Sequence, residues 1–379
     1  MPPSGVLSNA RLLSVLTWAE IDDLLLSHKE RRLLRHEYTL DELEDEMRRS
    51  REAELVRYRS QHGLLDIDGM DSSTFKLMFR FHKNDFDDLC SALLVPQEIT
   101  TAQNVRLCGR EALCVLLRRL AYPNRWCDLE GIFGRHSSVM SSATSRLISH
   151  ILSTFGHLLT DVNNHEWMSL ASLKEFAGAV EDKGSPLPNC WAFIDGTARP
   201  ICRPKRNQKL YFSGHKRMHM VKYQSLMCPN GIVCQLDGHY PGSWHDARIF
   251  RESGVYSKLE KLTRNEEFVV YGDPAYPLRP LLMKPYGGAC LSPAQQAFNC
   301  GMSAVRQAVE WGFGKVVAEF AFLDFKKKNQ KLLWQQVAAM YKVATILSNC
   351  HTTIYGSQVS SYFSLQPPKL HEYLKPRFA

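Results

Sequence analysis

The stretch WAFIDGTARP, residues 191–200, completes an apolar run that begins at Cys190 and stops at an aspartate. Five consecutive apolar residues predict a buried strand over 190–194, and a carboxylate at its end costs free energy unless something satisfies it. One interpretation is that Asp195 and Gly196 form a hairpin turn, because this dipeptide tolerates positive φ. The other is that Asp195 stands there for its chemistry, and the rest of the chain decides between the two.

Composition places the chain among ordinary globular proteins. It has 379 residues, enough for two or three domains, with 44% hydrophobic and 23% charged residues. No uninterrupted apolar run of about 18 residues occurs and the N-terminus lacks a signal-peptide pattern, so we expect neither a membrane partner nor export. The 11 cysteines are scattered and form no CxxC pair. They predict reduced thiols in a nuclear or cytoplasmic protein.

The positive charge of the chain is unevenly distributed. The net charge is +8, and no acidic residue occurs from Gly196 through Leu236. A solvated basic face is one explanation, but an acid-free run of this length beside an aspartate favours a polyanionic partner. The predicted DNA-binding residues of this run are Arg199, Arg203, Lys205, Arg206, Lys209, Lys216, Arg217 and Lys222.

The residues before 181 predict helices. The segment 1–70 is dense in charges of both signs and predicts an exposed helical extension, followed by an all-α region over 71–180. Within that region, 107–159 divides into an amphipathic helix, a short helix closing on Gly134, and a serine-fronted helix. This is the outline of a helix-turn-helix whose last helix enters a DNA groove, although three-helix bundles that bind no DNA have the same outline.

The residues after 180 change to a strand pattern. Strands are expected at 190–194, near 218–227, at 231–236 and from 268, with a tight turn at Pro229-Asn230-Gly231 between the second and third. Helices are expected from Ser243, as a cap, and over 302–322. The resulting order β-β-β-α-β-α gives an α/β domain over 181–360 with a mixed sheet, and leaves 361–379 as a tail. Two antiparallel turns and one crossover then make the first, third and fourth strands parallel.

This topology brings carboxylates together. Asp195 and Asp273 follow the first and fourth strands, and Asp246 follows the third, so all three are expected at one edge of the sheet. Such carboxylates repel each other unless a hard cation such as Mg²⁺ or Mn²⁺ binds them. The third main ligand is expected to be Glu310, although an ion pair with Arg306 at i−4 explains that residue equally well. Asp246 is either an auxiliary ligand or an acid in the first turn of a helix.

Six fragments then resemble one family: AFIDGT, YFSGHKRMHMVKYQ, PNGIVCQLDG, YPGSWHDARIF, YGDPAYP and FNCGMSAVRQAVEWGFG. Together they resemble the DDE-type transposases of the PIF/Harbinger superfamily and the nucleases domesticated from them. The resemblance implies an RNase H-like core that cuts DNA, with Asp195, Asp273 and Glu310 as catalytic residues. It also implies two Mg²⁺ or Mn²⁺ ions about 4 Å apart. The arginine that usually follows the family's glutamate is replaced here by Trp311.

The resemblance also implies partners. It predicts DNA as the substrate, a Myb-like DNA-binding protein as a companion, and a homo-oligomer assembled on the DNA. Two alternatives stay open. One is a catalytically silent DNA-binding or scaffold protein derived from a transposase, and the other is a nuclease acting on structured RNA or RNA hybrids.

Overall fold

The computed structural model describes residues 63–324 and 337–377. The chain divides into two compact units, one formed by 1–70 with 126–137 and the other by 71–125 with 138–379. Apart from its last eight residues, the predicted N-terminal extension lies outside the described residues, and the other predicted domain boundaries stay predictions.

The described part of the smaller unit contains α8 (Trp126–Phe133), which buries Leu129, Ile132 and Phe133. Gly134 follows it with φ +66°, and a Cβ there would collide with the carbonyl oxygen of Gly63. Only glycine therefore allows the chain to turn at this point while two backbone segments pass in contact. The Glu130 carboxylate then accepts a hydrogen bond from Ser137 N at 2.7 Å.

Helices also form the first part of the larger unit. They are α5 (Ser72–Phe79), α6 (Phe86–Ala92), α7 (Gly109–Ala121) and α9 (Ser137–Phe155), with a small antiparallel pair of strands, β1 (Glu98–Thr100) and β2 (Arg106–Cys108). Asp71 caps α5 by accepting hydrogen bonds from Ser73 N and Thr74 N. Three helices thus occur where they were expected over 107–159, namely α7, α8 and α9. Their arrangement as a helix-turn-helix stays a prediction.

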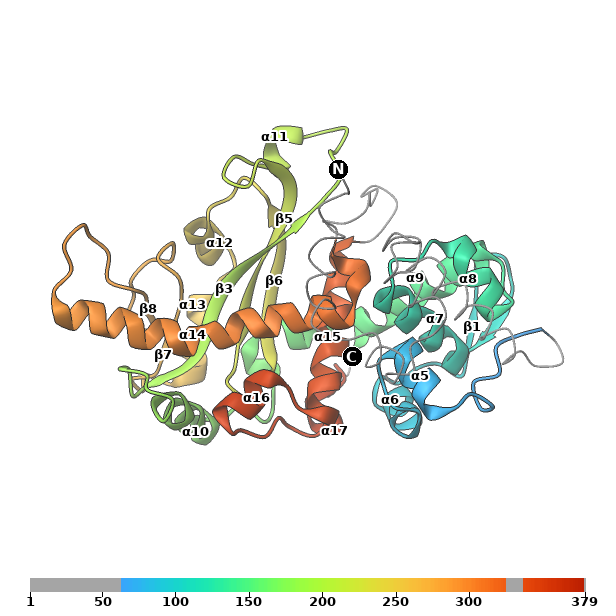
Figure 1. Cartoon of the computed structure of the whole chain (residues 1–379), viewed down its shortest axis with the longest axis horizontal. Helices are drawn as coiled ribbons and strands as arrows, with labels where there is room; N and C mark the ends of the chain where they lie inside the picture. The colour runs from blue at the N-terminus through green and yellow to red at the C-terminus, as the bar shows by residue number, and fades with distance from the viewer. Residues whose placement is uncertain (1–62, 325–336, 378–379) are drawn as a thin grey trace, which may run out of the picture. The chain divides into compact units, whose positions relative to one another are not determined.

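The second part of this unit contains a mixed six-stranded sheet (Figure 1). Its strands are β3 (Cys190–Pro200), β4 (Phe212–Ser213), β5 (Met218–Met227), β6 (Val233–Pro241), β7 (Val269–Tyr271) and β8 (Leu282–Met283). The order is β4-β5-β3-β7-β8, and β6 also pairs with β5. β3 and β6 are antiparallel to β5, whereas β7 is parallel to both β3 and β8. The fold is therefore mixed α/β.

Two strand pairings agree with the sequence-based expectation. β5 and β6 form the antiparallel hairpin around the turn at 228–231, where Gly231 has φ +85° and donates a hydrogen bond to the Cys228 carbonyl at 3.0 Å. The strand before Asp273, β7, lies parallel to the strand that carries Asp195, β3.

The predicted end of the first strand is wrong. β3 continues through Asp195 to Pro200, so Asp195 lies within the strand and Asp195-Gly196 makes no hairpin turn. The reason is that β5 supplies a partner for every residue of the extension, from Asp195 opposite Ser225 to Pro200 opposite Met220. β6 likewise extends to Pro241, beyond the predicted 231–236.

The predicted helices also need correction. Two helices, α12 (Asp246–Glu252) and α13 (Val255–Thr263), replace the single one expected from Ser243, because Gly254 takes φ +62° between them. The N-cap of α12 is His245 rather than Ser243. The helix expected over 302–322 is α14 (Pro293–Glu319), which starts earlier because Ser292 forms a capping box and Pro293 occupies the first helical position.

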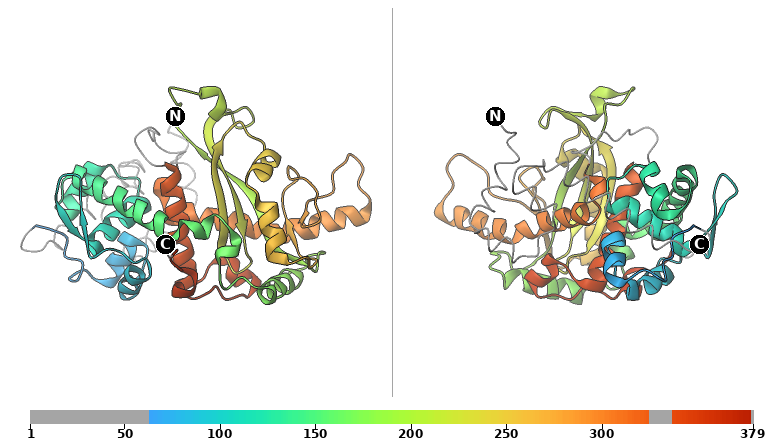
Figure 2. Two further views of the ribbon diagram at one scale, coloured as in Figure 1. Left: turned by 180° about the vertical axis from the view of Figure 1, so that it is seen from behind. Right: turned by 45° about the vertical axis from the view of Figure 1, so that its right-hand side comes forward.

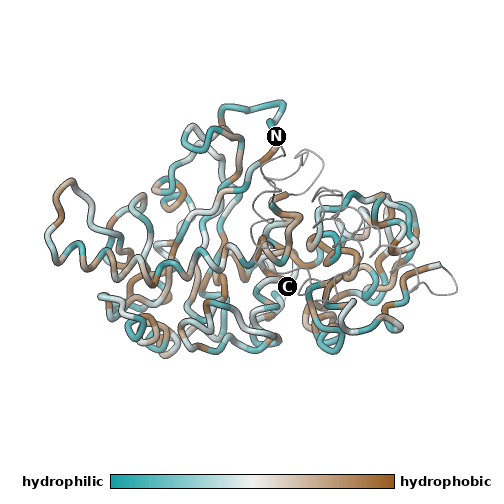
Figure 3. Tube along the Cα trace, viewed as in Figure 1, coloured by the Kyte–Doolittle hydropathy of each residue, from teal (hydrophilic) through white to brown (hydrophobic). Residues whose placement is uncertain are grey.

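Helices cover the sheet. α10 (Leu170–Glu181) and α14 pack on β3, and α15 (Val337–Tyr355) packs on β6 and α14. Figure 1 shows α14 crossing the strands, and the two views of Figure 2 show the strands extending beyond it. Figure 3 shows apolar residues along α15, in keeping with its buried position. No helix in the described part of the chain is long and apolar enough to cross a membrane.

The C-terminal part of the chain packs against α15. It contains α16 (Gln358–Phe363) and α17 (Leu370–Tyr373), and α17 contacts α15. The hydroxyl of the buried Tyr373 accepts a hydrogen bond from Asn349 at 2.8 Å. The described part of the predicted tail is thus folded onto the body of the larger unit.

Candidate active site

Two aspartates lie side by side on neighbouring parallel strands, Asp195 within β3 and Asp273 just after β7. Phe193 of β3 lies opposite Tyr271 of β7, and each aspartate stands two residues further along its strand direction. Asp195 and Asp273 are consequently adjacent, as expected from the sequence. Their proximity has an electrostatic effect, because the charge of Asp273 raises the pKa of Asp195.

Asp195 is the more buried of the two, with 15% of its side chain exposed. Its Oδ1 accepts a hydrogen bond from Gly196 N at 2.8 Å, and its Oδ2 lies 3.1 Å from Arg306 Nη2 of α14. Burial, which penalises the charged form, raises the pKa of Asp195 above its ordinary value, while Arg306 opposes the rise. The site thus contains a carboxylate that benefits from a further cation.

Asp273 lies just after β7, where the chain turns sharply. Its Oδ1 accepts a hydrogen bond from Ala275 N at 3.0 Å, and a Cβ at Gly272 would lie 2.9 Å from both Ile194 and Tyr276. Glycine is therefore required for the close packing that positions Asp273. Burial raises the pKa of this carboxyl above its ordinary value, and the nearby Asp246 raises it further.

Asp246 reaches the same place from the first turn of α12. Its Oδ1 lies 3.3 Å from Lys222 Nζ, and the same ammonium donates a hydrogen bond to the Trp244 carbonyl at 2.7 Å. A Cβ at Gly196 would lie only 3.1 Å from Asp246 Oδ1, so the backbone of β3 passes directly beside this carboxylate. Asp246 is thus both a first-turn acid and a neighbour of the other two aspartates.

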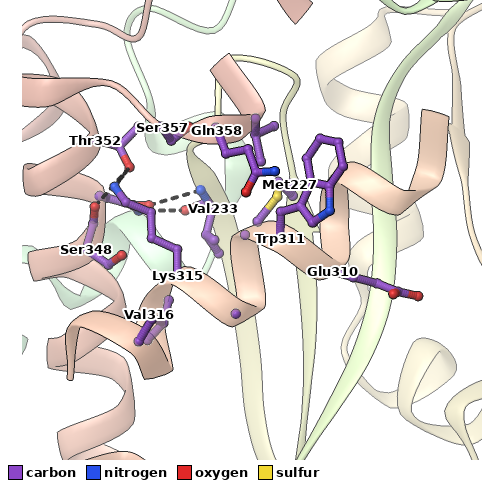
Figure 4. A pocket seen from close by; sticks show the side chains of 16 residues that line it. Met227, Val233, Glu310, Trp311, Lys315, Val316, Ser348, Thr352, Ser357 and Gln358 are labelled. Carbon is purple, nitrogen blue, oxygen red and sulfur yellow. Dashed lines mark hydrogen bonds between the residues drawn. The ribbon is translucent and has the colours of Figure 1, made fainter. Parts of the chain in front are cut away.

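Glu310 approaches this edge of the sheet from α14 in a different way. Its Oε1 lies 3.9 Å from Arg306 Nη1, while Arg306 Nη2 contacts Asp195. The ion pair at i−4 is therefore present, and the shared guanidinium links Glu310 to Asp195. The Glu310 side chain is 65% exposed, and Figure 4 shows it extending away from Lys315 on the same helix.

A buried tyrosine that the sequence patterns did not indicate lies below these carboxylates. Tyr276 is fully buried, and its hydroxyl has no hydrogen-bond partner among the residues that the structure describes. Burial is the main cause of its strongly raised pKa, and the charges of Asp195, Asp246 and Asp273 raise it further. Its ring packs edge-on against Phe250 at 5.9 Å. The motif YGDPAYP contained this residue, but nothing in the spacing indicated that its hydroxyl faces the acids.

The oxygen atoms of these carboxylates suit a hard divalent cation, although the described structure does not bring them together as a complete metal site. Carboxylate oxygens are the ligands that Mg²⁺ and Mn²⁺ prefer, and burial together with a neighbouring carboxylate raises the pKa of Asp195 and of Asp273. Within 63–324 and 337–377, no group of three or more histidine, cysteine, aspartate or glutamate side chains has metal-binding geometry. The predicted ligand set Asp195, Asp246, Asp273 and Glu310 therefore stays a prediction.

The predicted DNA-binding residues separate into two groups. Arg199 donates a hydrogen bond to the Tyr341 hydroxyl at 2.9 Å and stacks over that ring, while Lys222 is held by Asp246 and Trp244. Both therefore have partners within the protein. The exposed remainder is Arg203, Lys205, Arg206, Lys209, Lys216 and Arg217.

A cavity of about 540 Å³ lies between α14, α15, α16 and the ends of β5 and β6, and Glu310 is among the residues that line it (Figure 4). Lys315 lines it, donating a hydrogen bond to Thr352 Oγ1 at 2.6 Å and pairing with Glu319 Oε1 at 3.4 Å. Trp311, which stands where the family has arginine, packs edge-on against Tyr362 of α16 at 5.3 Å. This region therefore joins helices and lies apart from the aspartates.

Comparison with known proteins finds similarity in the segment that contains these carboxylates. Residues 194–349, which contain all four carboxylates described above, match the family model of the DDE superfamily endonucleases. The segment is similar to this superfamily, and the resemblance to DDE transposases and nucleases derived from them is confirmed. No solved structure matches the chain.

Two curated proteins are similar to this chain. One is a protein ALP1-like of Arabidopsis thaliana, 27% identical over 266 residues, which cover 65% of this chain and 63% of that protein. The other is a probable transposase for insertion sequence element IS702 of Microchaete diplosiphon, 32% identical over 146 residues, which cover 37% of this chain and 52% of that protein. The chain thus matches between half and two thirds of the length of these relatives.

Proposed function

We propose that this protein is a divalent-metal-dependent DNA endonuclease and strand transferase of the PIF/Harbinger type, or a nuclease domesticated from one. The observation that carries the proposal is the placement of Asp195 and Asp273. They follow the paired positions of two parallel strands, β3 and β7, within the segment that matches the DDE endonucleases.

An RNase H-like core is part of the proposal. The pairings that support it are the antiparallel run β3, β5 and β6, followed by β7 parallel to β3 on its other side. The order along the chain departs from a plain β-β-β-α-β-α. A short helix, α11 (Gln208–Tyr211), and β4 come before β5, and two helices precede β7.

The proposed ligands are Asp195, Asp273 and Glu310, with Asp246 as an auxiliary ligand, for two Mg²⁺ or Mn²⁺ ions. Bound metal supplies charge that activates a water molecule and stabilises the leaving 3′ oxygen. Glu310 joins the set by moving from Arg306 toward Asp195, a change that its 65% exposure allows.

The protein's own groups prepare this chemistry. Arg306 favours the charged form of Asp195, and Lys222 pairs with Asp246 and fixes the start of α12 by binding the Trp244 carbonyl. In hydrolysis the water oxygen bonds to phosphorus as the bond to the 3′ oxygen breaks. The water loses a proton, and the 3′ oxygen gains one. In strand transfer the released 3′ hydroxyl replaces water as the nucleophile.

Substrate binding is assigned to the exposed cations between β3 and β5. Six such residues in an acid-free segment match the phosphate backbone of DNA, and their neighbour Lys222 connects the segment to Asp246. Duplex DNA is proposed rather than structured RNA because three helices precede the core in the order of a helix-turn-helix.

Further proposals concern partners and location. We expect the protein in the nucleus, assembled as a homo-oligomer on DNA, with a Myb-like DNA-binding protein that supplies sequence selectivity. One helix-turn-helix module discriminates sites poorly against a genome. The purified chain should therefore prefer its own element ends over scrambled DNA by less than about a thousandfold, the lower end of what specific binders achieve.

A nicking assay tests the proposed activity. Supercoiled plasmid is incubated with the wild type and with Asp273→Asn, with Mg²⁺ and with chelator. We expect nicking only by the wild type with Mg²⁺, and retained DNA binding in the variant. If Asp273→Asn nicks the plasmid at the wild-type rate, the assignment of Asp273 to the active site is refuted. The absence of nicking by the wild type, with DNA still bound, would favour the silent DNA-binding protein. The structural argument for that alternative is that Glu310 is exposed and linked to Asp195 through Arg306.

A further inference from the structure

Residues 201–219, which run from the end of β3 through the first two residues of β5, form a projecting arm. Its base is closed by a hydrogen bond from Ile201 N to the His219 carbonyl at 2.8 Å, and it contains α11 and β4. β4 folds back on the start of β5, with Phe212 opposite His219 and Ser213 opposite Met218. Figures 1 and 2 show α11 beyond the ends of the long strands.

Large apolar side chains are exposed on this arm. Leu210, Phe212 and Met218 are 39%, 41% and 39% exposed. They are three of the seven large apolar residues that are exposed in the described part of the chain, although the arm has only 19 residues. Single exposed apolar residues are common, but such a group marks a surface that is covered in use.

The charges around these side chains indicate what covers them. The arm carries six exposed cations and no acidic residue, so a second copy of the arm would meet repulsion. A partner that is complementary to the cations and apolar side chains of the arm has phosphates at its surface and apolar faces beneath them. Duplex DNA has this construction, since its base pairs stack behind two anionic backbones.

The arm is anchored to the connection that leads to Asp246. Ser243 N donates a hydrogen bond to the Leu210 carbonyl at 3.2 Å, and Gly242 lies too close to the backbone of Met220 and Tyr211 for any side chain. Three residues after Ser243 the chain reaches Asp246. The arm and the proposed catalytic edge therefore share the short connection between β6 and α12.

We infer that the arm grips duplex DNA through its cations and inserts Phe212, flanked by Leu210 and Met218, between base pairs beside the phosphate to be cut. Inserted apolar side chains unstack and kink a duplex, and unstacking frees the adjacent backbone to bend toward a site. This inference rests on the proposed function for the position of the cut, but the insertion itself needs no metal and no cleavage.

Fluorescence of 2-aminopurine tests the insertion. A set of duplexes of about 30 base pairs, long enough to span one bent site, carries the probe at successive positions and is saturated with protein in the presence of chelator. Failure of the nuclease chemistry then leaves the reading unaffected. We expect the wild type to raise the fluorescence several-fold at one or two positions. Phe212→Ala should abolish the rise, and Tyr286→Ala, an equally exposed aromatic outside the arm, should keep it.

Two further measurements separate insertion from charge. Lys209→Ala should weaken binding but keep the full rise at saturation, and a duplex with a mismatch at the probe should restore the binding of Phe212→Ala to near the wild-type level. The inference is overturned if the wild type raises the fluorescence at no probe position, or if Phe212→Ala gives the full rise in fluorescence.

Two other partners of the apolar group are outcomes of the same test. A change of oligomeric state in the triple variant Leu210→Ser, Phe212→Ser, Met218→Ser would assign the group to a protein interface. Binding to phosphatidylserine vesicles that disappears in this triple variant would assign it to a membrane. Either result, with no fluorescence rise on DNA, overturns the inference.

Discussion

Helix α14 carries two ion pairs at i,i+4 spacing that have opposite surroundings. Arg306 pairs with Glu310 and Asp195 near the middle of the helix, and Lys315 pairs with Glu319 at its C-terminal end. Asp195 and Glu319 are similarly buried, with 15% and 13% of their side chains exposed. Burial alone therefore does not distinguish a site that does chemistry from one that joins helices.

The difference lies in charge balance and in hydrogen bonding. Glu319 accepts a hydrogen bond from Ser348 at 2.9 Å and lies 3.4 Å from Lys315, which also bonds to Thr352. Near Asp195, by contrast, four carboxylates are matched in the described structure by two cations, Arg306 and Lys222. The comparison suggests that a buried pair with its partners in place is structural, whereas an excess of one charge awaits a ligand.

Replacing Asp195 by asparagine should have the largest effect. Asn keeps the shape of the side chain but cannot supply the charge that binds metal, so cleavage should fall by at least about 10²–10³-fold. The thermal unfolding midpoint should stay close to that of the wild type. Plasmid nicking and differential scanning calorimetry measure both, and a variant that cuts normally would remove Asp195 from the catalytic set.

Replacing Glu319 by glutamine should give the opposite result. It leaves the buried Lys315 without its counter-ion, which typically costs about 3 kcal/mol of unfolding free energy. Cleavage by the molecules that stay folded should be unchanged. Urea unfolding and nicking at a permissive temperature test this. A loss of cleavage without a loss of stability would contradict the contrast between the two ion pairs of α14.

How far the sequence predicts these features depends on the residue. Apolar runs and the Pro229-Asn230-Gly231 turn were enough to place β5, β6 and β7, and hence to bring Asp195 beside Asp273. The extension of β3 to Pro200 was not predictable from Gly196-Thr197-Ala198, because β5 rather than local apolarity holds those residues. The pairing of Arg306 with both Asp195 and Glu310, and the position of the Tyr276 hydroxyl, depend on the packing of distant segments.

The pH dependence of the unfolding free energy should reflect the excess of negative charge near Asp195. Because the folded pKa values of Asp195 and Asp273 lie above the ordinary value of 3.8, the folded chain binds more protons than the unfolded chain just above that value. The free energy of unfolding contributed by these groups is therefore fully present below pH 3.8 and disappears as pH rises through the folded pKa values.

Without metal, Asp195→Asn should therefore flatten the pH dependence of the unfolding free energy between pH 3.8 and the folded pKa values. Asp66→Asn, at an aspartate outside the cluster, serves as the control. Chemical unfolding of the wild type and both variants across the window measures the effect. An Asp195→Asn curve that keeps the wild-type slope would mean that the carboxylate is not crowded as described.

Neutralising the arm should have the smallest effect on the chemistry. Alanine at Arg203, Lys205 and Arg206 should weaken binding to all DNA sequences and reduce the salt slope by roughly one for each phosphate that is no longer neutralised. The cleavage rate at saturating protein should change little. Fluorescence anisotropy over a range of salt concentrations checks this, and an unchanged slope would make the arm a solvated surface.

Iron-directed cleavage of the polypeptide tests the central claim most directly. Fe²⁺ replaces Mg²⁺ at many oxygen-ligand sites and, with ascorbate and peroxide, cuts the chain near the ion. With DNA bound, we predict cuts close to Asp195, Asp246, Asp273 and Glu310 that Mg²⁺ suppresses and that Asp195→Asn abolishes. Cuts elsewhere, or cuts at these positions that survive in the variant, would contradict the proposal that these carboxylates hold the catalytic metal.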